Sequence, residues 1–137
     1  MNLTPRATQA LENARLFARE AGHDRVGSQH LLYGLFQLGD GVHFHVLRNA
    51  GFTSDSLRQG VTTETLAAGS ALEALEQAEI EATALTHRFT GTEHILLALL
   101  ADGAAAHLFT SQGVDRGATR QIILGELRPP PPDPSVQ

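Results

Sequence analysis

The sequence predicts an all-α protein of eight helices, arranged as a tandem pseudo-symmetric repeat of two four-helix lobes. One motif occurs twice, 64 positions apart, as GSQHLL at 27–32 and GTEHIL at 91–96. A histidine lies four residues before each motif, at His23 and His87. Apolar residues recur at three- and four-residue steps, as in amphipathic helices, and no segment alternates apolar and polar residues convincingly.

The first copy is expected to form four helices, at about residues 5–21, 28–38, 42–50 and 54–61. Thr4 followed by Pro5 indicates a helix start, because threonine caps helices and proline fits the first helical position. Ser28 is expected to cap the second helix, and Thr53 or Ser54 the fourth. Glycines at 22, 39, 41 and 51 are expected to end the first three helices.

The second copy repeats this order at about residues 72–85, 92–100, 104–112 and 116–127. Thr92 and Asp115 are expected to cap its second and fourth helices, and Gly113 to end its third. The spacing falls from 64 to 62 along this copy, because Gly51 corresponds to Gly113. The second copy is therefore expected to be shorter around residues 102–106.

One domain is expected at residues 1–128, with repeat one at about 3–61 and repeat two at about 71–127. The linker between them, about 62–70, is short, which favours two lobes packed into one unit. Residues 129–137 begin with four prolines, which cannot continue a helix. They are expected to form an extended proline-rich tail or linker.

Length and composition argue against several classes of protein. The 137 residues suffice for a core without metal or disulfides, and the chain has no cysteine. The ten basic residues are scattered in a chain of net charge −5, which argues against nucleic acid as the main partner. No apolar run approaches the roughly 18 residues that span a membrane, and the N-terminus does not resemble a signal peptide. A cytoplasmic protein is expected.

Catalysis, cofactors and metal binding are not expected. The chain has no Gly-x-x-x-x-Gly-Lys-Ser/Thr loop, so it lacks the means of P-loop ATP hydrolysis. No nucleophile and base are paired in the pattern of an enzyme. His43 and His45 are two residues apart on a predicted helix, so they point to different faces and make a poor metal pair.

The doubled motif, the opening LTPRA at 3–7 and the turn GDGV at 39–42 resemble the N-terminal domain of the Clp AAA+ unfoldases, most closely the ClpC type. The corresponding family segments read FTPRA and GEGV. The resemblance extends from about Leu3 to Leu127. It implies a non-catalytic module of protein quality control that receives protein substrates and adaptors, while the ATPase that unfolds them lies elsewhere.

A second function stays open beside this one. A stand-alone Clp-repeat protein could act as a regulator or decoy that sequesters ligands or antibiotics directed at the unfoldase. The reading frame after Gln137 distinguishes the two, because continuation into a phosphate-loop ATPase favours the module and a stop codon favours the regulator.

The resemblance also implies ligand-site residues. In some ClpC-type domains the motif glutamate is associated with phosphoarginine on client proteins, since a carboxylate pairs with the guanidinium while helix-start N–H groups and cations hold the phosphate. Gln29 cannot supply that charge, and Gly69 and Ser70 stand where the first copy has Thr4 and Arg6, so a site drawn from one copy would be incomplete. The other interpretation of Glu93 is an acid that favours a first helical turn. The candidates are Thr4, Arg6, Ser28, Gln29, Thr92 and Glu93.

The remaining candidates concern histidines and partner contacts. His30 and His94 are interpreted as bonding the neighbouring loop and fixing the helix entry, rather than as ligands or acid–base groups. A groove between the lobes is the expected docking place for an adaptor or peptide. Leu3, Phe52 and Phe89 are expected to be half-exposed, and the partner surface is assigned to Leu3, Arg58, Phe89 and Arg120. A solvated helix face is the alternative for the charged positions. The buried core is expected to hold Leu31, Leu32, Leu35, Leu96, Leu97, Leu99 and Leu100.

Overall fold

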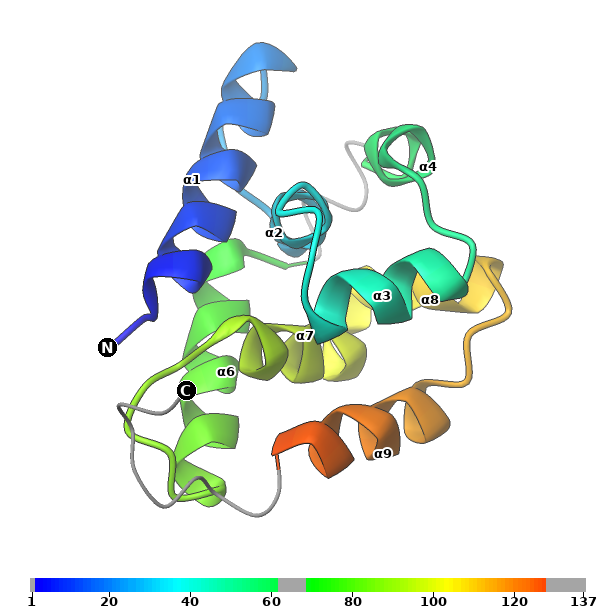
Figure 1. Cartoon of the computed structure of the whole chain (residues 1–137). Helices are drawn as coiled ribbons and strands as arrows, with labels where there is room; N and C mark the ends of the chain where they lie inside the picture. Colours follow the sequence, from blue (N-terminus) through cyan, green and yellow to red (C-terminus); the bar gives the residue numbers. More distant parts are fainter. Residues whose placement is uncertain (1, 62–68, 128–137) are drawn as a thin grey trace.

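The computed structural model describes residues 2–61 and 69–127, and within these ranges the chain forms eight helices and no strand beyond two isolated bridges (Figure 1). The expected all-α fold of two four-helix lobes is confirmed. Most of the expected linker and the proline-rich tail lie outside the described residues. The helices are α1 (Pro5–Glu20), α2 (Ser28–Phe36), α3 (Val42–Asn49), α4 (Ser54–Gln59), α6 (Ala71–Ala84), α7 (Thr92–Ala101), α8 (Gly103–Ser111) and α9 (Arg116–Leu127).

Side chains cap most of the helices at their N-termini. The Thr4 hydroxyl accepts the N–H of Ala7 at the start of α1, and the Thr53 hydroxyl accepts that of Ser56 at the start of α4. Asp115 accepts the N–H of Ala118 in α9. These caps confirm the expectations from sequence.

Two expected caps are wrong. Ser28 and Thr92 are the first residues of α2 and α7, and the N-cap positions belong to Gly27 and Gly91. A glycine has no side chain to cap with, but a histidine in the first turn accepts the N–H of that glycine, as described below.

Helix ends follow the glycines. Gly51 and Gly113 end α3 and α8 in the left-handed region, with φ of 97° and 71°, which glycine adopts without strain. The α7–α8 connection consists of Asp102 alone, whereas residues 37–41 connect α2 to α3. This shorter connection agrees with the reduced spacing between the copies.

The core centres on α2 and α7, which pack against each other and against helices of both lobes. All seven leucines expected in the core are buried. No single helix in the described part is long and apolar enough to cross a membrane. The pair α7 and α8 reaches that length and composition only together, across an 86° bend, and α7 is largely buried in the core.

The expectations for exposed apolar residues are mixed. Leu3 is half-buried and Phe89 is 51% exposed, as expected. The expectation that Phe52 is half-exposed is wrong, because this residue is only 3% exposed. Its ring packs edge-on against Phe109 of α8, with centroids 5.7 Å apart, so the corner before α4 is covered by the other lobe.

Each lobe also pairs its opening segment with a loop of the other lobe. The N–H of Thr4 donates to the Thr90 carbonyl at 3.0 Å, and the N–H of Thr90 donates to the Asn2 carbonyl at 2.7 Å. In the approximate counterpart, the N–H of Ala71 donates to the Val26 carbonyl at 2.9 Å. This exchange brings the start of α1 beside the start of α7.

Candidate functional site

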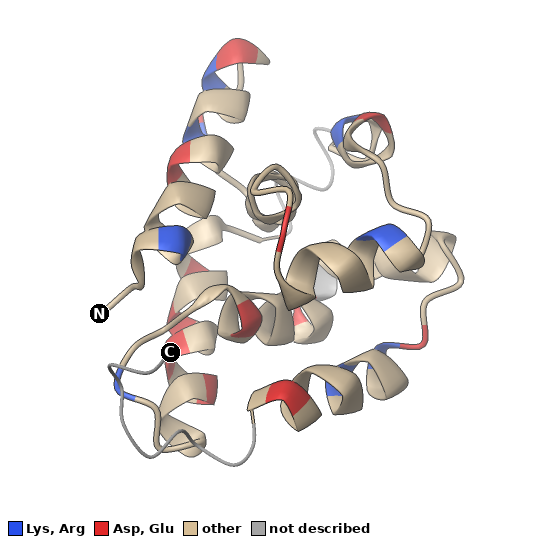
Figure 2. Cartoon of the chain, viewed as in Figure 1, with Lys and Arg blue, Asp and Glu red and all other residues tan. Residues whose placement is uncertain are grey.

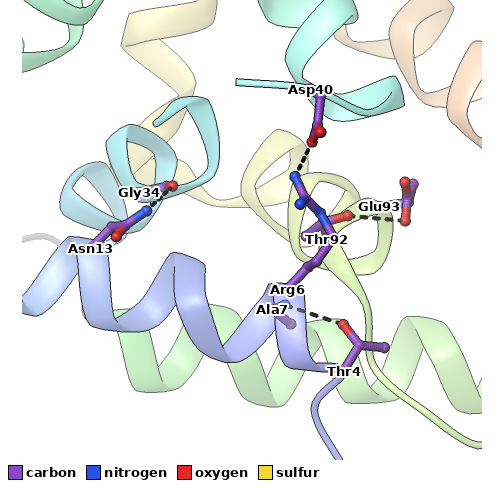
Figure 3. Close-up of polar contacts among 8 residues, drawn as sticks. All are labelled: Thr4, Arg6, Ala7, Asn13, Gly34, Asp40, Thr92 and Glu93. Carbon is purple, nitrogen blue, oxygen red and sulfur yellow. Dashed lines mark hydrogen bonds and ion pairs between the residues drawn. The ribbon is translucent and has the colours of Figure 1, made fainter. Parts of the chain in front are cut away.

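The predicted ligand residues Thr4, Arg6, Thr92 and Glu93 lie together, although they come from different copies (Figure 3). A Cβ built on Gly91 would lie 3.6 Å from the Thr4 methyl and 3.7 Å from a Glu93 carboxylate oxygen. The buried Thr92 hydroxyl donates to Glu93 Oε2 at 3.1 Å. One site therefore combines the opening of the first copy with the motif of the second.

Asp40 completes this cluster from the α2–α3 connection. Its carboxylate accepts a hydrogen bond from the Arg6 guanidinium and forms an ion pair with it (Figure 3). Both side chains remain exposed, at 49% for Arg6 and 69% for Asp40. Sequence reasoning did not select Asp40, although it lies in the GDGV turn that carries part of the family resemblance.

His43 of α3 lies beneath the charged cluster. It is 1% exposed, and neither ring nitrogen has a well-formed hydrogen bond to any described residue. Burial lowers the pKa of His43, with Arg6 acting in the same direction, while Glu93, Asp40 and the Leu35 carbonyl oppose the shift. His43 could have been assigned to the buried face from its place four residues before Leu47.

The matching position of the other copy is closed. Ser28 and Gln29 are both fully buried, and the Ser28 hydroxyl donates to Asp102 at 3.4 Å. Ser70, 64 positions after Arg6, caps α6 through its hydroxyl instead of offering a charge. The glutamate and the arginine are therefore both missing at the starts of α2 and α6. Both are present at the candidate site at the starts of α1 and α7.

The histidine pairs hold the starts of α2 and α7. The Gly27 N–H donates to His30 Nδ1 at 2.8 Å, and His30 Nε2 faces His23 Nδ1 at 2.9 Å. In the second copy the distances are 2.9 Å for Gly91 to His94 and 2.8 Å for His94 to His87. These bonds confirm that His30 and His94 fix the helix entries.

The predicted partner arginines have different surroundings. Arg120 forms a two-pronged ion pair with Glu81, at 3.0 and 2.9 Å. Arg58 lies over the rings of Phe17 and Tyr33, 5.2 Å from each centroid, and donates from Nε to the Tyr33 hydroxyl at 3.1 Å.

The groove expected between the lobes stays a prediction, and the hollows described for this surface lie elsewhere. Two shallow hollows lie along α1 on the first lobe, and one of them is lined by Phe17, Tyr33 and Arg58. Leu3 and Phe89 line neither hollow. Of the four predicted partner residues, Arg58 lines one of these hollows, and their assignment to one partner surface stays a prediction.

Within the described ranges, no group of three or more His, Asp or Glu side chains is arranged to hold a metal ion. What the cluster at the starts of α1 and α7 offers is a carboxylate, a guanidinium and helix-start N–H groups. That combination suits a ligand with both a cationic and an anionic part.

Comparisons with known proteins find the same repeat elsewhere. The sequence model of the Clp repeat (R) N-terminal domain matches twice, at residues 2–72 and 68–137. A probable ATP-dependent Clp protease ATP-binding subunit of Chlamydia pneumoniae is 34% identical over 138 residues, which cover 90% of this chain. The negative regulator of genetic competence ClpC/MecB of Bacillus subtilis is 31% identical over 134 residues, 88% of this chain. The chain spans 16% of the length of each of these curated relatives.

Solved structures share the fold at lower identity. The N-terminal domain of the caseinolytic protease associated chaperone ClpD from Arabidopsis thaliana has a TM-score of 0.74 at 23% identity, over 93% of this chain and 98% of that one. The Hsp104 N-terminal domain from Candida albicans has a TM-score of 0.75 at 17% identity, over 94% of this chain and 93% of that one.

Proposed function

Because the chain belongs to the Clp repeat (R) N-terminal domain family, we propose that it is a binding module that receives protein substrates and adaptors for a Clp-type unfoldase in the cytoplasm. It acts without catalysis of its own. The small share of its relatives' length that it spans, 16%, supports this division of labour, since the ATPase would occupy another part of such proteins.

The observation that carries the proposal is the charged cluster at the starts of α1 and α7 (Figure 3). The half-buried Glu93 carboxylate suits a guanidinium, and Arg6 with the N-termini of two helices suits a phosphate. We infer arginine-phosphorylated protein as the ligand class. Nucleic acid is not proposed, because Figure 2 shows the basic residues spread over several helices and interspersed with acidic ones.

Calorimetric titration with phosphoarginine tests this assignment. We expect saturable binding by the native chain and loss of that binding in Glu93→Ala. Glu76→Ala is the matched control, because Glu76 is an exposed acid of α6 outside the cluster, and it should bind like the native chain. Absence of binding at millimolar phosphoarginine would refute the ligand.

A second experiment tests recruitment of proteins. The immobilised chain is incubated with one protein in arginine-phosphorylated and unmodified forms, and with the adaptors of the cognate unfoldase. Capture of the phosphorylated form or of an adaptor supports the module, and capture of none of them contradicts it.

A further inference from the structure

Asp40 is paired with Arg6, the arginine that an anionic ligand would need. Its carboxylate holds the Arg6 guanidinium across the gap between the α2–α3 connection and the start of α1 (Figure 3). Both side chains are about half exposed or more. Exposed ion pairs contribute little to stability, so an incoming anion can separate this one at small cost.

The matching residue in the other lobe has a different task. Asp102 lies 62 positions after Asp40, and its carboxylate accepts the N–H of Ala105 in α8 at 3.2 Å. The helix after Asp40, α3, starts at Gly41 without any side-chain cap. Asp40 is therefore not engaged in holding its helix, and its carboxylate is directed to Arg6.

The charges around the site give this pair a consequence. The charged side chains that act on the buried His43 beneath the cluster are Arg6 from α1, Asp40 from the connection and Glu93 from α7. With His43 neutral, one positive and two negative charges leave the cluster at −1. An unmodified guanidinium is attracted by that charge, whereas a phosphorylated one is repelled as long as Asp40 stays on Arg6.

We propose that Asp40 is an internal competitor for the phosphate part of the ligand, and that it sets how strongly the Arg6–Glu93 site distinguishes phosphorylated from unmodified arginine. The proposal rests on the proposed function for the identity of the ligand. When phosphoarginine binds, its phosphate takes Arg6 and the Asp40 carboxylate turns to solvent. Asp40 is thus a specificity-determining residue that lowers affinity for the anion.

The test compares native chain, Asp40→Asn and Asp24→Asn in titrations with phosphoarginine and with arginine. Asp24 is the matched control, because it is an exposed aspartate beyond the opposite end of α1. We expect Asp40→Asn to bind phosphoarginine about three- to tenfold more tightly at low salt, and arginine no more tightly. The gain should shrink as salt is raised, and Asp24→Asn should match the native chain.

Two results would overturn the proposal: binding of phosphoarginine that Asp40→Asn does not tighten, or an equal gain for both ligands. If phosphoarginine binds to neither the native chain nor Asp40→Asn, the proposed function fails. A titration with inorganic phosphate then tests the role of Asp40 separately. Amide signals of residues 6–8 are then followed by NMR during a phosphate titration. A response at lower phosphate concentration in Asp40→Asn supports competition for Arg6, and an equal or absent response refutes it.

Discussion

At the scale of single residues, two imidazoles perform the task that Glu or Gln performs in a capping box. His30 and His94 accept a glycine N–H through Nδ1, so the proton of each neutral ring is on Nε2, facing His23 or His87. Burial first, and the neighbouring imidazole second, lower the pKa of both to about 4. Ser28 and Thr92 were the natural sequence candidates for caps, because hydroxyl residues are the commoner caps.

Acid should therefore destabilise the fold through these two histidines. Histidine titrates near 6.5 in the unfolded chain and at about 4 here, so the unfolded state takes up protons first as the pH falls. The stabilisation is fully present above about pH 6.5 and is lost progressively towards pH 4. In urea titrations we expect the free energy of unfolding to fall by about 3–5 kcal/mol between about pH 7.5 and 4.5, at 1.36 kcal/mol per pKa unit.

The control for this pH dependence is the double variant His30→Gln/His94→Gln. Glutamine offers an oxygen to the glycine N–H but does not titrate. The variant should lose much less stability than the native chain over the same pH range. An unchanged pH slope would assign the acid sensitivity to other groups.

The two motif positions Gln29 and Glu93 should differ in how much a change of charge affects stability. Gln29 is fully buried and Glu93 is half-buried beside Arg6 and Asp40. We expect Gln29→Glu to lower the free energy of unfolding by about 2–4 kcal/mol, because a carboxylate would be buried without a cation. Glu93→Gln should change stability by about 0.5 kcal/mol or less. Urea denaturation of both variants measures these changes. An unchanged free energy of unfolding in Gln29→Glu would show that the first-copy position can open to solvent.

At the scale of elements, α1 and α2 cross at Gly34. A Cβ on this residue would lie 2.2 Å from the Ala10 carbonyl oxygen, which is backbone and cannot move aside. Asn13 also donates to the Gly34 carbonyl at 3.2 Å. In the second lobe the corresponding residue, 64 positions later, is Ala98, which is 1% exposed. The first lobe therefore needs a closer helix crossing than the second.

Gly34→Ala should separate α1 from α2. Although alanine is the better helix former, the clash with backbone outweighs that gain, and we expect a loss of about 2–3 kcal/mol. Gly60→Ala is a useful comparison, because its Cβ would clash, at 2.2 Å, with the end of the Leu108 side chain rather than with backbone. Thermal unfolding followed by circular dichroism measures both, and equal midpoints for the two variants would contradict the tight crossing.

Sequence predicted elements well and contacts between copies poorly. Periodicity and caps placed all eight helices, because these signals lie within a few residues of each other. The doubled motif and the opening segment, through their resemblance to the Clp family, named Thr4, Arg6, Thr92 and Glu93 as ligand candidates. They could not show that these residues meet across copies, that Asp40 reaches Arg6, or that Phe52 is covered by Phe109, because each of these contacts joins distant segments.

At the scale of the whole molecule, each copy depends for its folding on contacts with the other. The opening segment of each copy is hydrogen-bonded to a loop of the other copy, through Thr4 and Thr90 and through Ala71. One hydrophobic core contains residues of both lobes. The central helices α2 and α7 contact each other as well as their own lobes. Half of the chain would expose the core face of its central helix to water, which opposes folding.

The chain should consequently unfold in a single transition, and neither half should fold alone. We expect amide NMR signals of both lobes to disappear at the same urea concentration, together with the fluorescence change of Tyr33 in the first lobe. Arg120→Ala, which removes an ion pair to Glu81 within the second lobe, should shift the transitions of both lobes equally. Isolated repeats 3–61 and 71–127 should lack cooperative unfolding by circular dichroism and regain helicity when mixed. Two separate transitions, or a folded isolated repeat, would mean that the lobes are independent and that the site at α1 and α7 forms only when they dock.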